Sequence, residues 1–116
     1  MSASDRFDLA VVGAGPGGYV AAIRAAQLDL RVAVIERDRP GGVCLNWGCV
    51  PSKALLSGAE LVENLKERGE LFGVATGGLR LDYAKAIDHS RKCADRLSKG
   101  VQALFKKNRI ELVKGR

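Results

Sequence analysis

The sequence predicts an α/β fold, from the order of its apolar runs and the glycines between them. Two short apolar runs typical of buried strands, 9–12 and 32–35, flank a glycine-rich turn and an alanine-rich helical segment at about 16–28. Parallel strands are joined by a crossover helix of this kind. A third apolar run, "IELV" at 110–113, follows a long helical segment and predicts a third strand.

Composition limits the class of protein. The chain has 116 residues, of which 47% are hydrophobic and 28% charged, so we expect one packed domain. The apolar run at 9–23 is broken by glycine and proline, so we expect neither a signal peptide nor a membrane span. A net charge of +6 with only three Phe, two Tyr and one Trp predicts no nucleic-acid partner. We expect a cytoplasmic protein, in which a cysteine pair is more often catalytic, redox-sensing or metal-binding than structural.

Three glycines form a nucleotide-binding fingerprint. Gly13, Gly15 and Gly18 have the spacing Gly-x-Gly-x-x-Gly between the first strand and the helix, and Glu36 ends the second strand. The first glycine permits the turn, the second lets backbone approach a pyrophosphate, and the third lets helix and strand pack closely. Pro16 suits the first helical turn, where its missing N–H has no partner. The alternative is a glycine-rich turn with a surface glutamate.

A cysteine pair follows in a segment, 37–51, that we expect to be a loop. Five residues of helix rise by roughly 7.5 Å, and a disulfide requires Cα atoms less than about 7 Å apart, so Cys44 and Cys49 cannot lie on one continuous helix. Val50 precedes a proline and is biased away from helix. We therefore expect a new helix to begin at about Pro51.

The position of Cys49 predicts a reactive thiol. It lies just before a helix N-terminus with Lys53 one turn further on, and both features favour a thiolate of low pKa. As a structural staple the pair would contribute little, because closing a loop of about six residues stabilises by roughly 2 kcal/mol. Redox function is the better interpretation.

A metal site is the competing interpretation. His89 and Cys93 are four residues apart on a predicted helix, and with Cys44 and Cys49 they would supply a zinc site of three cysteines and a histidine. The gap in the first pair is unusual for zinc, and His89 lies in a charged stretch. We expect no metal site, with His89 on the surface and Cys93 in packing.

A long helix is predicted from Leu81 to Lys107, packed on a neighbouring helix at 52–68. Asn108 is the expected left-handed cap. The residues expected to form the packing stripe are Tyr83, Ile87, Ser90, Ala94, Leu97, Val101 and Leu104.

Together, "GAGPGG", Glu36 and "GGVCLNWGCVPSKALL" resemble the flavin-dependent disulfide oxidoreductases, most closely the dihydrolipoyl dehydrogenases. The resemblance covers nearly the whole chain. It implies an incomplete Rossmann-like FAD-binding domain of three parallel strands with helices, including a long helical pair. Leu45 and Ser52 favour the lipoyl enzymes, because mercuric reductases tend to have valine and glutathione reductases lysine at these positions. A fragment of a mercuric or glutathione-type reductase remains an alternative, as does a noncatalytic nucleotide- or zinc-binding module.

The resemblance also implies a mechanism. Cys44 would be the interchange thiol and Cys49 the charge-transfer thiolate against a noncovalent FAD. Electrons would pass from dihydrolipoamide through the Cys44–Cys49 disulfide to FAD and then to NAD. Val43 departs from the threonine of many relatives, so any flavin contact there must come from backbone; Trp47 is assigned packing alone. The residues expected to contact FAD are Gly13, Gly15, Pro16, Gly17, Gly18, Glu36, Arg37, Gly42, Val43, Cys44, Cys49 and Lys53.

Length is the other departure from the family pattern. We expect residues 1–116 to be the N-terminal part of the FAD-binding domain, without the NAD-binding and dimerisation domains. Such a chain would be inactive by itself. In the complete enzyme the resemblance implies a homodimer that acts on lipoyl groups of 2-oxo acid dehydrogenase complexes or of the glycine cleavage system.

Overall fold

Three parallel strands and a set of helices form the protein, as the sequence predicts. The computed structural model describes residues 6–75 and 77–116. Strands β1 (Leu9–Val12), β2 (Val32–Glu36) and β3 (Glu111–Lys114) form a parallel sheet in the order β1-β2-β3. The helices are α1 (Pro16–Gln27), α2 (Gly42–Asn46), α3 (Cys49–Arg68) and α4 (Tyr83–Lys107), with a 3₁₀ turn η2 (Gly69–Phe72) after α3.

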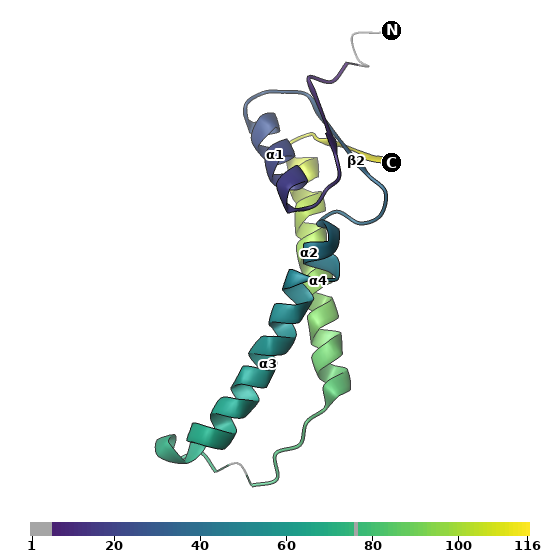
Figure 1. The fold of residues 1–116 in the computed structure, drawn as a ribbon. Coiled ribbons are helices and arrows are strands. Elements are labelled where there is room, and N and C mark those ends of the chain that lie inside the picture. The colour runs from purple at the N-terminus through teal and green to yellow at the C-terminus, as the bar shows by residue number, and fades with distance from the viewer. Residues whose placement is uncertain (1–5, 76) are drawn as a thin grey trace.

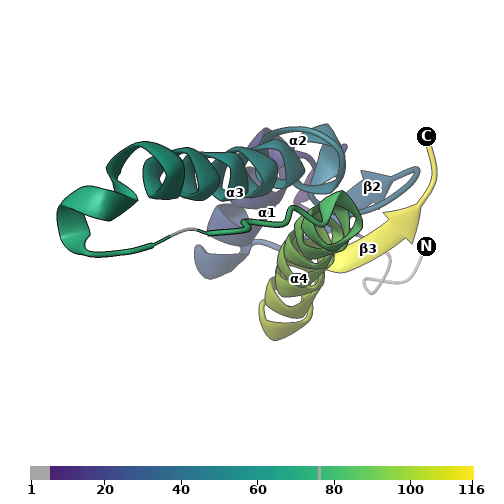
Figure 2. The same ribbon diagram turned by 90° about the horizontal axis from the view of Figure 1, so that it is seen from below.

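The core lies between the sheet, α1 and the C-terminal half of α4. The central strand β2 is the most buried, with Val34 completely inaccessible. Figure 2 shows α1 and α4 beside the sheet. In a sheet, buried valines and alanines from the strands need a covering layer, which these two helices supply. The buried core residues are Ala14, Ala22, Ala25, Val32, Val34, Leu45, Val101, Phe105 and Ile110.

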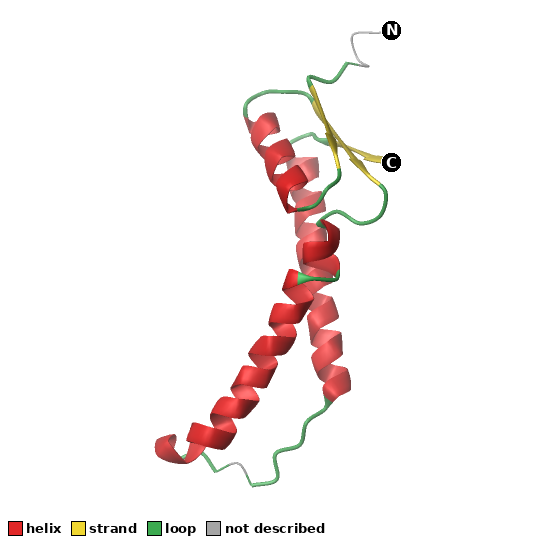
Figure 3. Cartoon of the chain, viewed as in Figure 1, coloured by secondary structure: helices red, strands yellow, loops and turns green. Residues whose placement is uncertain are grey.

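The helical pair makes the molecule long, 70 × 25 × 18 Å. Helices α3 and α4 pack against each other and extend away from the sheet, while the C-terminus lies beside the sheet (Figure 1). Figure 3 shows that α3 and α4 are joined at the end far from the sheet, where η2 follows α3. Within residues 6–75 and 77–116, no helix combines the length and apolar character needed to cross a membrane.

The packing stripe of α4 differs from the expected one. Ser90, Ala94 and Val101 are buried as predicted, but Tyr83 is 72% exposed, and Leu97 and Leu104 are 46% and 43% exposed. The stripe drifts by one position after Ala94, because α4 packs on α1, α2 and β3 as well as on α3. The buried residues of α4 are Ser90, Ala94, Ser98, Val101 and Phe105.

Asn108 is the C-cap of α4 as expected, but the left-handed conformation lies one residue later, at Arg109. Asn108 has φ −94°, whereas Arg109 has φ +55° and takes the left-handed conformation. The Ile110 N–H donates to the Phe105 carbonyl at 2.9 Å and the Arg109 N–H to the Lys106 carbonyl at 3.2 Å. This double pattern closes a helix when an apolar residue follows the left-handed one. Burial of Ile110 against the core therefore decides the position.

The segment 37–51 was expected to be a loop, but only part of it is. It contains the short helix α2, and α3 begins at Cys49 rather than at Pro51. Val50 is helical despite the following proline, because Pro51 stands in the first turn, where its missing N–H would have no intrahelical acceptor. The required irregularity is present at Gly48, with φ −117° and ψ −110° between the two helices.

Candidate functional site

A cleft of about 470 Å³ lies at the carboxyl ends of the parallel strands. In open α/β sheets this edge is where ligands bind. Val12 and Ile35 come from the ends of β1 and β2, and Trp47 comes from the end of α2. Of the predicted contacts, those lining the cleft are Gly13, Glu36, Arg37, Gly42 and Val43. Those that do not line it are Gly15, Pro16, Gly17, Gly18, Cys44, Cys49 and Lys53.

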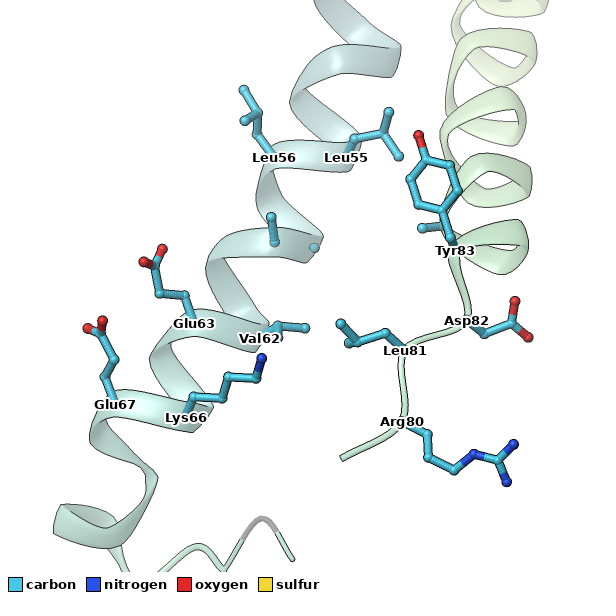
Figure 4. A pocket seen from close by; sticks show the side chains of 13 residues that line it. Leu55, Leu56, Val62, Glu63, Lys66, Glu67, Arg80, Leu81, Asp82 and Tyr83 are labelled. Carbon is cyan, nitrogen blue, oxygen red and sulfur yellow. The ribbon is translucent and has the colours of Figure 1, made fainter. Parts of the chain in front are cut away.

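A larger groove of about 890 Å³ opens between α3 and α4, but it is not the candidate site. Figure 4 shows Leu55 and Val62 of α3 facing Leu81 and Tyr83 across it. The groove includes no cysteine and no residue of the glycine turn. The smaller cleft contains the groups able to bind a nucleotide and is therefore the candidate site.

The first glycine turn requires glycine for two separate reasons. Gly13 has φ +94°, which residues with a side chain rarely adopt. A Cβ at Gly18 would lie only 1.9 Å from the Gly13 carbonyl oxygen, so α1 packs directly on the turn. At Gly15 and Gly17 a Cβ would meet nothing within 4 Å. That open space at the N-terminus of α1 suits an anion, because the first N–H groups of a helix are unpaired.

A second glycine turn packs against the first. The Gly41 N–H donates to the Ala14 carbonyl at 2.7 Å, and a Cβ at Gly42 would lie 2.8 Å from the Gly15 Cα. Gly41 and Gly42 both have positive φ, at 104° and 59°. The two turns thus approach too closely for side chains. This contact brings the start of α2 beside the start of α1.

Glu36 ties the end of β2 to the glycine turn. Its carboxylate accepts hydrogen bonds from the Ala14 N–H at 2.8 Å and from the Asp38 N–H at 2.9 Å. Burial of the carboxyl raises its pKa, but the backbone hydrogen bonds from Ala14, Asp38 and Arg37, with the Arg37 charge, outweigh burial and lower the pKa of Glu36 below 4.5. The group is therefore ionised at neutral pH, and each oxygen retains a lone pair for a further donor.

Stability should depend on the ionisation of Glu36. Its pKa is lower in the folded chain than in the unfolded chain, so its contribution is fully present above the ordinary value of 4.5 and is lost as the pH falls through the folded pKa. We expect urea unfolding midpoints of wild type and Glu36→Gln to differ at pH 7 and to converge below pH 4.5. A difference that stayed constant between these pH values would contradict the ionised interaction.

The two cysteines meet at the junction of two helices. Cys44 lies in α2 and Cys49 is the first residue of α3, and both are free thiols in this structure. A side-chain hydrogen bond that the Cys44 thiol donates to Cys49, then burial and the Cys49 charge, raise the pKa of Cys44; the backbone N–H of Cys49 and the positive charge of Lys53 oppose this in part. Cys44 is half-buried and Cys49 exposed. The pair is placed for thiol–disulfide exchange.

Sequence reasoning missed several residues that line the cleft or hold α2. Trp47, assigned packing alone, is 49% exposed and lines the cleft. Gly115 and Arg116 complete the cleft beyond β3. Asn46 is 1% exposed, and its Nδ2 donates to the Pro40 and Gly42 carbonyls at 3.2 and 3.0 Å. No periodicity or motif signal distinguished these positions, because the contacts depend on how α2 packs.

The zinc-site alternative receives no support. On α4 the Cys93 Sγ lies 3.6 Å from the His89 Nε2, and His89 is exposed as expected. In the described part of the chain no three or more His, Cys, Asp or Glu side chains gather into a possible metal site. His89 and Cys93 therefore do not join Cys44 and Cys49.

Similarity to known proteins agrees with this geometry. The family model for pyridine nucleotide-disulphide oxidoreductases matches residues 7–116. The chain is 50% identical over 112 residues to the dihydrolipoyl dehydrogenase of Zymomonas mobilis, covering 97% of this chain and 24% of the relative. It is 53% identical over 109 residues to that of Mycobacterium bovis, covering 94% and 23%. The chain thus spans about a quarter of the length of these curated relatives.

A solved structure shares the fold. The crystal structure of LpdA from Mycobacterium tuberculosis superposes with a TM-score of 0.82 at 27% identity, over 92% of this chain and 23% of that one. The relatives named dihydrolipoyl dehydrogenase are enzymes, and they are oxidoreductases. The chain itself belongs to the pyridine nucleotide-disulphide oxidoreductase family.

Proposed function

We propose that this chain is the FAD-binding and dithiol-bearing part of an enzyme that oxidises dihydrolipoamide with NAD as the electron acceptor. The observation that carries the proposal is the position of Cys44 in α2 and of Cys49 at the start of α3, two helices packed against each other immediately beside the cleft. Residue 43 lines the cleft and the next residue is the first cysteine. The names of the curated relatives support dihydrolipoamide as the substrate.

The cleft and the adjoining start of α1 together fit the polar half of FAD. Open space at Gly15 and Gly17 leaves the unpaired N–H groups of α1 accessible to a pyrophosphate. Glu36 is ionised and has lone pairs left for ribose hydroxyls. When bound, the flavin would supply a two-electron acceptor for the dithiol and a donor to NAD. Val43 has its side chain 70% exposed and no hydroxyl, so its contribution would be through backbone.

The chemistry of the cysteines is thiol–disulfide exchange. One thiol of dihydrolipoamide attacks the Cys44 sulfur of the Cys44–Cys49 disulfide, forming a mixed disulfide and releasing Cys49 as a thiolate. The second substrate thiol then displaces Cys44, so lipoamide leaves as the cyclic disulfide and two electrons with two protons remain on the dithiol side.

Other components would come from the rest of the enzyme. We place this chain at the N-terminal part of the FAD-binding domain, with the NAD site, the catalytic base and the homodimer contacts in the three quarters of the relatives outside the match. Turnover by the chain alone is not expected. Lipoyl groups of 2-oxo acid dehydrogenase complexes or the glycine cleavage system are the proposed partners. A reducible pair suits a reducing compartment, the cytoplasm.

Flavin retention tests the cofactor. After incubation with FAD and desalting, we expect the wild-type chain to keep the visible flavin bands, and Trp47, the single tryptophan, to lose fluorescence on binding. Glu36→Gln should weaken binding by roughly tenfold, because a hydrogen bond to a charged group contributes about 1.5–3 kcal/mol. Glu63→Gln, on the distal groove, is the matched control and should bind as wild type. A wild-type chain without flavin, or equal affinity of both variants, would contradict the proposal.

A further inference from the structure

Three polar residues of α4 reach the segment that carries the first cysteine. Arg91, Asp95 and Ser98 are spaced four and three residues apart, which places them on one face of the helix. Each contacts a residue of the segment 39–46, which lies about fifty positions earlier in the chain. We name these three residues the α4 clamp.

The buried member of the clamp is Ser98. It is 1% exposed, and its hydroxyl donates to the Pro40 carbonyl at 2.7 Å. The same carbonyl accepts from the Asn46 Nδ2 at 3.2 Å. The turn before α2 is therefore held from both sides, by α4 and by the C-terminal end of α2 itself. The Pro40 carbonyl restrains the backbone of this turn, because a buried carbonyl that loses its hydrogen-bond donors destabilises the fold.

The two charged members hold the ends of the segment. The Arg39 Nη2 and the Asp95 Oδ1 are 2.5 Å apart, and this hydrogen bond with Arg39 lowers the pKa of Asp95. At the other end the Arg91 Nη1 donates to the Asn46 carbonyl at 3.2 Å. Asn46 stands between the two cysteines in sequence, so Arg91 fixes the backbone that joins them. A charged donor gives a stronger hydrogen bond than a neutral one.

We propose that the α4 clamp sets how readily the Cys44–Cys49 pair is reduced, by holding α2 against the start of α3. This inference rests on the proposed function of the pair. Two thiols held in contact form a disulfide more readily than two mobile thiols, because the orientation has been fixed in advance. Loosening the clamp would let α2 move and lower the equilibrium constant for disulfide formation. Arg91, Asp95 and Ser98 are positioning residues, since they contact the backbone and Arg39 rather than the sulfur atoms.

The test measures the disulfide equilibrium of the 116-residue chain in buffers of oxidised and reduced dithiothreitol. All variants carry Cys93→Ser, so that mass spectrometry of the alkylated chain reports the one remaining pair. We expect Arg91→Met to lower the constant by about fivefold and Ser98→Ala by about threefold. Arg91→Lys keeps a charged donor and should stay within about twofold of the parent.

The matched control is Lys92→Met, which removes the neighbouring cation of α4. The Lys92 Nζ pairs with the Asp88 Oδ2 at 2.6 Å within α4, and the Lys92 side chain is 74% exposed. We expect its constant to stay within about twofold of the parent, because an exposed ion pair contributes little. The thermal unfolding midpoint of every variant is measured as well. The disulfide equilibrium constant is then determined well below that midpoint, so that a lower constant reports lost positioning and not unfolding.

The outcomes separate the two ideas. A parent chain that forms no Cys44–Cys49 disulfide overturns the proposed function and the clamp with it. If the parent forms the disulfide but Arg91→Met and Ser98→Ala leave its equilibrium constant unchanged, the clamp alone is overturned. The same holds if Lys92→Met lowers that constant as much as they do. A selective fall in the two clamp variants, rescued by Arg91→Lys, supports it.

Discussion

Cys44→Ser should abolish disulfide exchange between this chain and lipoamide. The wild-type chain, starting with free thiols at both positions, is expected to transfer two electrons to oxidised lipoamide and to form an internal Cys44–Cys49 disulfide. Serine cannot form the mixed disulfide, so no internal disulfide and no dihydrolipoamide should appear. The measurement is the mass of the alkylated chain together with the dihydrolipoamide released.

Two further variants make this result specific. Cys49→Ser keeps the first thiol without its partner and should stop at a mixed disulfide on Cys44, because no second thiol resolves it. Cys93→Ser should exchange as wild type, since Cys93 lies on α4 beside His89 rather than beside the pair. Internal disulfide formation in Cys44→Ser, or its loss in Cys93→Ser, would assign the redox pair to other cysteines.

Gly18→Ala should be the most destabilising single methyl addition in the glycine turn. The new Cβ would lie 1.9 Å from the Gly13 carbonyl oxygen and 3.3 Å from the Val11 side chain. Neither α1 nor β1 can shift without disturbing the core, so we expect the free energy of unfolding to fall by about 3 kcal/mol, the upper part of the range for overpacking. Total stability is typically about 5–15 kcal/mol, so the loss is large. Flavin retention should fall with it.

Gly100→Ala is the matched control for that variant. Gly100 lies within α4, and a Cβ there would meet nothing within 4 Å. Alanine should raise the free energy of unfolding by about 0.5–1 kcal/mol, because glycine is unfavourable within a helix. Urea unfolding followed by circular dichroism measures both variants. A Gly18→Ala chain as stable as Gly100→Ala would contradict the close packing of α1 on the turn.

The main elements were predictable because they depend on local patterns. The apolar run at 9–12 is the whole of β1, and the alanine-rich segment after Pro16 is α1, with the end one residue earlier than expected. The glycine spacing predicted where side chains would be excluded, and at Gly18 the structure gives the physical reason. Such signals lie within a few residues of the feature that they describe.

The surroundings of the cysteines were not predictable in the same way. The helix α2 has only five residues, too few for a periodic pattern, and it is held by Asn46 and by α4. The helical state of Val50 went against the local bias of a residue before proline, because Pro51 falls within the first turn of α3. The left-handed conformation of Arg109, after the C-cap Asn108, likewise follows from the burial of Ile110.

The sequence by itself determined the order of strands and helices, the glycine turn, the acid at the end of β2 and the spacing of the two thiols, because each depends on neighbours in the chain. Only the tertiary structure decided which distant groups hold them. The second glycine turn against the first, Trp47 in the cleft and the α4 clamp on segment 39–46 all join residues far apart in sequence. Such contacts exist only after the sheet and helices have packed, so no local pattern encodes them.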